Sequence, residues 1–410
     1  MLLQFSVENF KSIKDKQTLD MVEIGTKHIQ EHKKSLIEGQ ILPLAVIYGP
    51  NGGGKSNLLQ AINYMQNYIA RFSYTSGGIS PVLSFAFDNV SKSKPTFFEV
   101  VIVVDNIEYK YSFEIKGTQI VSEYLYTINA KGSVYIFSRD ESGTKIYVSE
   151  IAEIITDTII SKVAKDMPLL LYIRQYYDIS PIKEIVEWFS NVFYVDYGLE
   201  MQESQLLEVV FNKYKDKEFK KSFLDVINRL GVSLVDFDIR IVERVINATF
   251  GQQLRKEFDI RTIHEIGGNK YRLSFLDESQ GTKKIFGLVP MFMDSLQNGK
   301  IVIIDELDAK LHPLLLKKIM ELYSDKDINV GGGQLIFTSH DMVTLDSKLL
   351  RRDEIYFMCL NDVQESGLFS LVEIRGRDGK VVRRDGNISK QYLEGRYGAD
   401  PHFQKIMAWE

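Results

Sequence analysis

Cysteine is almost absent from this sequence, whose 410 residues include one, Cys359. A single thiol cannot form an intramolecular disulfide, which excludes a disulfide-stapled secreted fold and favours a reducing compartment. Cys359 stands in an apolar run typical of a strand. A small buried side chain is therefore a better interpretation of this residue than a reactive thiol.

Long apolar runs are also lacking. No stretch approaches the ~20 apolar residues that a membrane-spanning helix needs. The N-terminal segment meets Glu8, Asn9 and Lys11 too early for a signal peptide. We therefore expect a cytoplasmic protein with no membrane partner.

The chain has no strong excess of charge of one sign and no internal repeat. Its net charge is −5, with 44% hydrophobic and 26% charged residues, which is ordinary for a globular protein. This balance argues against a uniformly basic nucleic-acid-binding surface and leaves a local basic patch open. The length exceeds one typical core, so we expect one large elaborated domain or two lobes.

The stretch VIYGPNGGGKSNLL (46–59) is the strongest motif. Between Gly49 and Ser56 it follows the pattern G-x-x-x-x-G-K-S, after a strand-like run and before a helix-like segment. In a P-loop, backbone N–H groups hold phosphate oxygens, the lysine reaches the outer phosphates and the serine hydroxyl ligates Mg²⁺. The alternative is a glycine-rich turn. The predicted nucleotide-binding residues are Asn51, Gly52, Gly53, Gly54, Lys55, Ser56 and Asn57.

Hydrophobic periodicity predicts the local structure of the first 150 residues. Residues 2–8 and 41–48 have the pattern of strands, and 57–72 carry the apolar stripe of a helix. Short alternating runs from 81 to 150 predict an antiparallel meander with a turn at Asp105-Asn106. We assign residues 1–150 to the N-terminal part of the nucleotide-binding core and its antiparallel β lobe.

The hydrophobic periodicity changes twice in the rest of the chain. Residues 151–262 are interpreted as a helical insertion, with one helix over 180–193 and strand-like runs near its end. Residues 263–410 alternate helix and strand. With a P-loop near the other end of the chain, this alternation predicts an α/β fold whose parallel-sheet core is split by the insertion.

The segment KIVIIDE (300–306) is a second phosphate-chemistry motif, an apolar strand that ends in two acidic residues. Asp305 can bind Mg²⁺ directly or through water, and Glu306 can orient or deprotonate an attacking water. The alternative is a strand that merely ends in an acidic turn. The P-loop favours the first interpretation, with the two motifs at opposite ends of one sheet.

Two further segments carry candidate residues. His340 follows the strand-like run QLIFTS, where it can donate a hydrogen bond to a γ-phosphate or be only a satisfied polar residue. In LSFLDESQGTKK, Ser279 and Gly281 stand at a helix start that forms a second anion site. An ordinary capped helix start is the alternative. A second anion site makes sense if it closes on the γ-phosphate held by a neighbouring subunit.

The order NFKS (9–12), GPNGGGKS, ESQGT, IDELDAKLHP and TSHD resembles the ABC-type ATPases of the SMC, RecF and recombination-repair group. It is more closely similar to bacterial AAA-like ATPases related to the overcoming-lysogenisation-defect (OLD) proteins, many of which belong to phage-defence operons. The resemblance covers roughly 1–130 and 265–400. It implies an ABC-type P-loop ATPase head with an antiparallel β lobe and a helical insertion, which binds ATP and Mg²⁺.

The resemblance also implies roles for single residues, although ESQGT departs from the transporter signature LSGGQ and no Q-loop glutamine is identified. In chain order these are Lys11 and Ser12 near the nucleotide, Lys55 and Ser56 as Walker A lysine and Mg²⁺ ligand, Ser279 and Gly281 as signature residues acting in trans, Asp305 and Glu306 as Walker B aspartate and catalytic glutamate, Asp308 as D-loop aspartate, and His340 as switch histidine.

The function implied is ATP hydrolysis that opens and closes a homodimer or higher homo-oligomer. Three outputs are open: a sensor or regulator of anti-phage defence with a separately encoded effector, which we favour; a RecF-like DNA-repair or chromosome-maintenance clamp; and an ATP-binding scaffold with little turnover. OLD relatives often carry a C-terminal nuclease domain. Only 70 residues follow His340, too few for one, so we expect the effector to be a separate protein.

DNA is a further candidate partner because of the basic segment IRGRDGKVVRRDG (374–386). Its cations can follow a phosphate backbone. Asp378 and Asp385 interrupt the segment and no aromatic residues are interleaved, which favours a solvated basic face.

Overall fold

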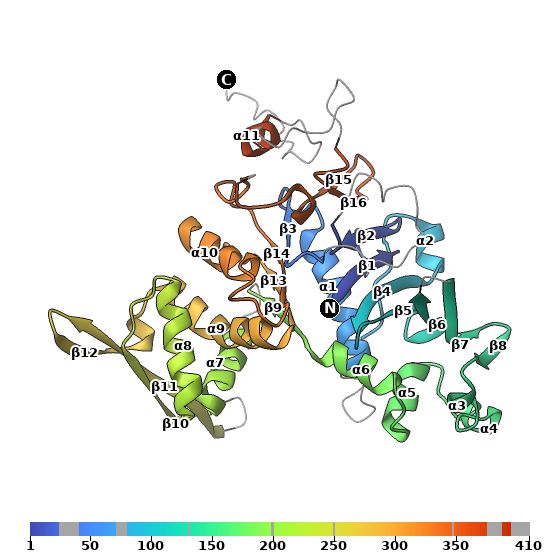
Figure 1. The fold of residues 1–410 in the computed structure, drawn as a ribbon, viewed down its shortest axis with the longest axis horizontal. Helices are drawn as coiled ribbons and strands as arrows, with labels where there is room; N and C mark the ends of the chain where they lie inside the picture. The colour runs from blue at the N-terminus through green and yellow to red at the C-terminus, as the bar shows by residue number, and fades with distance from the viewer. Residues whose placement is uncertain are drawn as a thin grey trace.

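The computed structural model describes most of the chain, and the part it describes forms three β-sheets with flanking helices (Figure 1). For residues 129, 201–205, 243–248 and 251–257 only the backbone is described. The described residues are 1–23, 41–70, 80–129, 132–197, 201–248, 251–346, 348–374 and 388–394. The predicted turn at Asp105-Asn106 lies inside them, and most of the basic segment 374–386 lies outside.

A six-stranded sheet forms the centre of the molecule, in the order β16-β15-β3-β14-β13-β9. Five neighbouring strands are parallel, and β16 pairs antiparallel at one edge. The parallel-sheet core predicted from the sequence is thereby confirmed. Its strands are β3 (Leu44–Tyr48), β9 (Val192–Asp196), β13 (Ile301–Asp305), β14 (Gln334–Thr338), β15 (Ile355–Leu360) and β16 (Ser366–Ser370).

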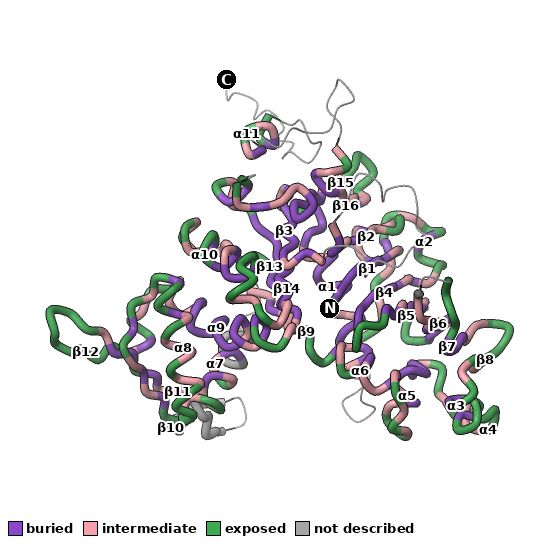
Figure 2. The backbone as a smooth tube through the Cα atoms, in the orientation of Figure 1, coloured by how far each residue is buried: buried purple, intermediate pink, exposed green. Residues whose placement is uncertain are grey.

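Both faces of the central sheet are buried, and Figure 2 colours β3, β13 and β14 as buried. Along β3, Val46 enters one hydrophobic core while Ala45 and Ile47 enter the core on the other face. Parallel strands covered on both faces need apolar residues at consecutive positions. This explains why their sequences are continuous apolar runs and not alternating ones.

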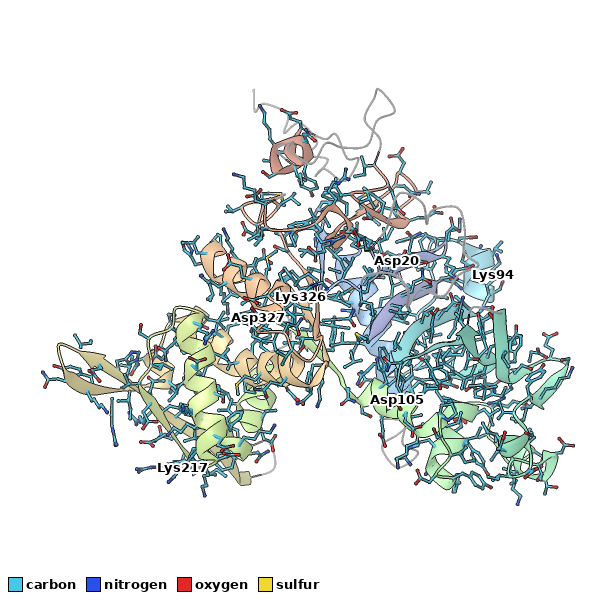
Figure 3. All side chains as sticks on the ribbon, in the orientation of Figure 1. Asp20, Lys94, Asp105, Lys217, Lys326 and Asp327 are labelled. Atoms are coloured by element: carbon cyan, nitrogen blue, oxygen red, sulfur yellow. The ribbon has the colours of Figure 1, made fainter. Side chains whose placement is uncertain are left out.

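A seven-stranded antiparallel sheet forms the lobe on one side of this core. The predicted meander is confirmed, and Asp105 (Figure 3) and Asn106 form its first turn with φ of +49° and +61°. This left-handed pair is the geometry of a type I′ hairpin turn. The strands are β1 (Leu2–Glu8), β2 (Gln17–Asp20), β4 (Thr96–Val104), β5 (Ile107–Lys116), β6 (Gln119–Asn129), β7 (Gly132–Asp140) and β8 (Gly143–Ile146).

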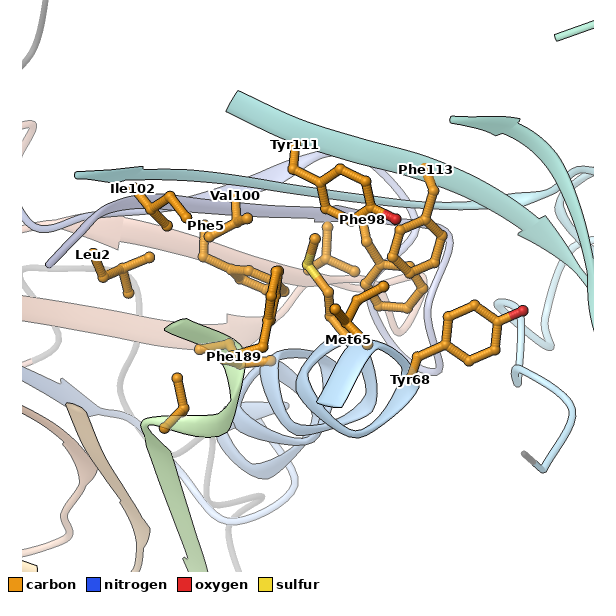
Figure 4. Packing of buried hydrophobic residues seen from close by; sticks show 14 of the residues in the cluster. Leu2, Phe5, Met65, Tyr68, Phe98, Val100, Ile102, Tyr111, Phe113 and Phe189 are labelled. Carbon is orange, nitrogen blue, oxygen red and sulfur yellow. The ribbon is translucent and has the colours of Figure 1, made fainter. Parts of the chain in front are cut away.

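Helix α1 (Lys55–Ala70) lies between the two large sheets. Its buried residues include Leu58, Ile62 and Met65, which belong to the apolar stripe predicted from the sequence. Tyr68 packs on Phe113 of the antiparallel sheet, with ring centroids 5.5 Å apart (Figure 4). Aromatic packing of this kind stabilises a pair beyond the area that it buries. The P-loop helix is thus fixed by both sheets.

Helices between residues 89 and 190 lie along the antiparallel lobe or pack beside α1, and the helices over 201–229, 280–298 and 313–324 cover the second face of the core. A three-stranded sheet of β10 (Asp236–Ala248), β11 (Gly251–Ile266) and β12 (Asn269–Ser274) lies beyond them, opposite the antiparallel lobe. None of the described helices is both long and apolar enough to span a membrane. The helices are α2 (Asn89–Ser93), α3 (Ser149–Ala152), α4 (Asp157–Ile160), α5 (Leu169–Tyr176), α6 (Ile182–Ser190), α7 (Met201–Lys213), α8 (Lys217–Arg229), α9 (Gln280–Asn298), α10 (Pro313–Ser324) and α11 (Ile388–Leu393).

Two expectations about the core are wrong. The segment 180–193 is not one helix, because α6 ends at Ser190 and β9 begins at Val192 and joins the central sheet beside β13. A short apolar run suits either a helix or a strand, and pairing with β13 decides it. The P-loop and KIVIIDE strands are also not at opposite ends of the sheet, because only β14 lies between β3 and β13. The division into three chain segments stays a prediction.

Candidate functional site

The loop between β3 and α1 is shaped by close backbone approach. Gly49, Gly52 and Gly54 have φ of +152°, +77° and +102°. A Cβ atom on Gly49 would lie 2.0 Å from the Met358 carbonyl oxygen, and one on Gly54 would lie 2.2 Å from Ser366 Oγ. Glycine is therefore required by both conformation and space. The loop backbone therefore packs against β15 and β16, two strands from the C-terminal part of the chain.

Replacing single glycines of this loop should separate these two requirements. Gly52→Ala meets no atom within 4 Å and should cost only the left-handed conformation, about 1–2 kcal/mol. Gly54→Ala has a similar conformational cost and also strikes Ser366 Oγ, which adds about 1–3 kcal/mol of overpacking. We expect a lower thermal unfolding midpoint for Gly54→Ala than for Gly52→Ala. Equal midpoints would mean that Ser366 moves aside without cost.

Lys55 begins α1 with its side chain turned into the loop. The residue is 6% exposed, and Nζ donates to the carbonyl oxygens of Gly49 at 2.9 Å and Pro50 at 3.0 Å. Burial lowers the pKa of Lys55 to about 8, and the carboxylates of Asp305 and Glu306 oppose this shift. The structure therefore brings together the predicted lysine and the predicted acidic pair. Phosphate oxygens in this place would stabilise the charged form of the lysine.

Asp305 and Glu306 stand at the carboxyl end of β13, two strands from the P-loop. The Thr338 hydroxyl, at the end of β14, donates to Asp305 Oδ1 and accepts the N–H of Glu306 at 2.7 Å. Asp305 is 5% exposed, whereas Glu306 is exposed. Glu306 has a φ of +55°, a conformation uncommon outside glycine. One threonine therefore orients both acidic residues, the first inward and the second outward.

Asp308 and His340 lie beside this pair. The backbone N–H of His340 donates to Asp308 Oδ2 at 2.8 Å. Partial desolvation, and next the ammonium of Lys55, lower the pKa of His340 below its ordinary value. A neutral imidazole at pH 7 carries one N–H that can donate to a phosphate oxygen. The predicted switch histidine is thus placed near the predicted phosphate-binding lysine.

The NFKS segment contacts the P-loop and α1. Ser12 Oγ accepts from Asn57 Nδ2 at 2.7 Å and lies 3.0 Å from the position of a Cβ on Gly54. Lys11 Nζ donates to Gln60 Oε1 on α1. Ser12 therefore lies next to the loop and Lys11 next to α1, and their place near a nucleotide stays a prediction.

Ser279 and Gly281 form a helix start, as the sequence predicts. Ser279 is the N-cap of α9, and its Oγ accepts the N–H of Thr282 at 3.0 Å. A Cβ on Gly281 would lie 3.1 Å from the carbonyl oxygen of Lys310. This helix start opens onto a cleft of about 850 Å³ that residues 49–57 do not line. The basic and imidazole side chains lining the cleft are Arg229, Lys310, His312, Lys317 and Lys318.

The residue before this helix start is anchored to the outer sheet. The Glu278 carboxylate accepts from the Thr262 hydroxyl and lies 2.8 Å from His264 Nε2, both on β11. The position of the ESQGT segment therefore depends on the three-stranded sheet.

Two residues of this region were missed by sequence reasoning. Asp196 ends β9 directly opposite Asp305 in the parallel register. Desolvation lowers the pKa of Lys11, and the charge of Asp196 opposes this shift. The signal was the pattern VFYVD, which ends in an acid as KIVIID does. Lys284 of α9 donates to the carbonyl oxygen of Glu306 at 2.9 Å. Nothing in the local pattern distinguishes this lysine from its neighbour Lys283.

The donors around Lys55 suit a magnesium nucleotide. Mg²⁺ prefers oxygen ligands and is usually held by one or two protein groups together with phosphates and water. The hydroxyl of Ser56 and the carboxylate of Asp305 are such oxygens, and Thr338 fixes the carboxylate. Within the described residues, no cluster of three or more His, Cys, Asp or Glu side chains is arranged to hold a metal ion.

Comparison with known proteins gives a family and a structural likeness. The family model AAA_21, described as "AAA domain, putative AbiEii toxin, Type IV TA system", matches residues 44–346. That range begins at β3 and ends shortly after His340. A solved structure titled "Crystal structure of the SmcHead bound to the C-winged helix domain of ScpA" is similar at 15% identity and a TM-score of 0.46, and covers 90% of this chain and 97% of that chain. No curated protein matches the chain.

Proposed function

This chain belongs to the AAA_21 family of P-loop ATPases, and we propose that in it ATP joins two subunits and hydrolysis releases them. One P-loop holds the nucleotide, and the ESQGT segment of the neighbouring subunit closes over the γ-phosphate. A ligand shifts an equilibrium only toward the state that it binds better, and here ATP binds the joined subunits better. The biological output of ATP binding and hydrolysis is therefore a change of assembly.

One observation carries this proposal. Each subunit has two candidate phosphate sites, and the one at Ser279 and Gly281 opens onto a cleft that the P-loop does not line. Four basic side chains and one carboxylate, that of Glu321, line this cleft, and the net positive charge favours an anion. Lys55 and the acidic pair belong to the other site. Each site is therefore half of a complete nucleotide site, and a two-fold dimer would complete both.

The groups around the P-loop have separate tasks in the proposed reaction. Lys55 stabilises negative charge on the outer phosphates. Glu306, exposed at the end of β13, orients the attacking water and takes its proton. The His340 side chain donates a hydrogen bond to a γ-phosphate oxygen. Ser56 and Asp305 would hold Mg²⁺, which would neutralise negative charge on the phosphates.

We propose further that the assembly controls a separately encoded effector in anti-phage defence. The family description, which names a toxin and a Type IV TA system, supports a system of more than one component. ATP-dependent co-purification of the product of a neighbouring gene would support this output. Binding of duplex DNA that weakens steeply with salt would instead favour a DNA clamp.

Mixing two inactive variants tests the shared site. Lys55→Ala removes the P-loop half, and Gly281→Arg fills the space above the α9 start, so neither pure variant has an intact site. Random exchange makes half of the dimers mixed, and each mixed dimer has one intact site of two. If sites act independently, an equal mixture should recover roughly a quarter of wild-type ATPase activity.

The controls concern folding and exchange. Both variants must be folded at the temperature of the assay, and labelled subunits must be shown to exchange. Full activity of Gly281→Arg alone would rule out the ESQGT segment as the closing element. If the mixture stays inactive despite exchange, a tethered dimer with one broken site distinguishes sites that act in cis from sites that must fire together.

A further inference from the structure

Lys284 is a buried lysine whose amino group contacts the turn that carries Glu306. The residue lies on α9 and is 6% exposed. Its Nζ donates to the carbonyl oxygens of Glu306 at 2.9 Å and Ala309 at 3.0 Å, and it stands 3.8 Å from the ring centre of Tyr197. These contacts join α9 to the ends of β13 and β9.

A charge in this place is costly for the fold. Burial lowers the pKa of Lys284 to about 7, which the charges of Asp308 and Glu306 oppose and that of Lys310 reinforces. None of the ion pairs found among the described residues includes Lys284; its close partners are two carbonyl groups and an aromatic ring. An apolar side chain of similar length would avoid desolvating an ammonium but would leave the carbonyl oxygens of Glu306 and Ala309 without this donor. These two effects on stability oppose each other, so the position of the lysine against the Glu306 turn is its distinctive feature.

The lysine fixes the backbone of Glu306 from one side while Thr338 fixes it from the other. The N–H of Glu306 donates to Thr338 Oγ1, and its carbonyl oxygen accepts from Lys284. Between these two bonds, Glu306 has the left-handed φ of +55°. The direction of the Glu306 side chain follows from this backbone conformation. Loss of the lysine would therefore free the carboxylate to point elsewhere.

The same lysine stands one helical turn beyond Gly281. Gly281 packs against the carbonyl of Lys310, and Lys284 binds the carbonyls of Glu306 and Ala309. The start of α9 thus contacts the turn 306–310 at two points on one helix face. A shift of the helix start must move this turn or break these bonds.

We propose that Lys284 is a positioning residue that orients Glu306 and couples it to the ESQGT helix start of the same subunit. This inference rests on the proposed function, in which Ser279 and Gly281 engage the partner's ATP while Glu306 acts on the subunit's own. Closure on one nucleotide is then transmitted through Lys284 to the glutamate that serves the other. The two sites of a dimer become cooperative.

Three variants of the full chain test the proposal. Lys284→Met keeps an unbranched side chain and removes the donors, and Lys284→Arg keeps donors. Lys300→Met is the matched control, because Lys300 also stands over a ring of β9, Phe193, at 5.2 Å and binds Asp294 of α9 at 2.9 Å, away from the turn 306–310. Turnover, ATP affinity, the Hill coefficient for ATP and the thermal unfolding midpoint are measured for each.

We expect Lys284→Met to lower kcat by ~10-fold or more, since misplacing a reacting group by about 1 Å can cost 10²-fold. ATP affinity should stay within about twofold, because no phosphate-binding group is removed. The unfolding midpoint should change little, because the loss of two hydrogen bonds to carbonyl oxygens opposes the relief of burying an ammonium. The Hill coefficient should be above 1 in the wild type and fall toward 1. Lys284→Arg should recover part of kcat, and Lys300→Met should resemble the wild type.

Other outcomes overturn the proposal. A wild-type kcat in Lys284→Met would rule out that Lys284 positions Glu306. A lower unfolding midpoint with parallel losses of affinity and kcat, or the same losses in Lys300→Met, would mean a merely structural lysine. A Hill coefficient of 1 for ATP in the wild type would show that the two sites of the dimer are not coupled. Failure of the dimer itself is recognised separately, because the wild type would then stay monomeric with ATP, whereas sites that are coupled would still form the dimer.

Discussion

Glu306→Gln should reduce ATP turnover by about 10²–10⁴-fold while ATP still binds, because the amide keeps the shape of the side chain and cannot accept the proton of water. Turnover is measured as phosphate release. The variant should accumulate the closed assembly, so gel filtration with ATP and Mg²⁺ should show a larger or more compact species than without nucleotide.

The matched control is Glu187→Gln on α6, an exposed glutamate near Arg174. It changes the same chemical group away from the site and should leave turnover unchanged. If Glu306→Gln turned over ATP at the wild-type rate, Glu306 would not be the base. If it were slow but formed no new species with ATP, the closing of two subunits would be wrong.

Lys55→Ala should weaken ATP binding by roughly 10–100-fold, the loss expected for a charge-assisted hydrogen bond to phosphate, and should remove measurable turnover. No other residue of the P-loop brings a full positive charge to the phosphates. Titration of ATP with thermal unfolding as the readout measures this loss, since a ligand raises the midpoint only of a protein that it binds.

Lys55→Met distinguishes the charge from the packing of the side chain. The lysine is buried, so alanine also leaves a cavity, whereas methionine fills the space. Both variants should show the same weakening of ATP binding, and the alanine variant should unfold at a lower temperature than the methionine variant without ATP. Unchanged ATPase activity in either variant would contradict the assignment of the P-loop.

The strands of the core could be predicted because each has a local signature. The apolar runs that end at Tyr48, Asp305 and Thr338 are continuous, as burial on both faces requires. The run that ends at Asp196 has the same character but is only five residues long. This run follows directly after the helix that ends at Ser190, so the sequence alone does not distinguish it from a further turn of that helix.

The phosphate-binding loop and the acids at the end of β13 were determined by the sequence itself, because each depends on the order of a few covalently linked residues. A strand, glycines at set spacing and a lysine before a helix make a P-loop without help from the rest of the chain. The same holds for Ser279 as an N-cap. Ser366 against Gly54, Asp196 opposite Asp305, and Lys284 bound to Glu306 were decided only by the tertiary structure. These contacts join residues from 22 to 312 positions apart, and no local periodicity encodes which distant strands and helices pack together.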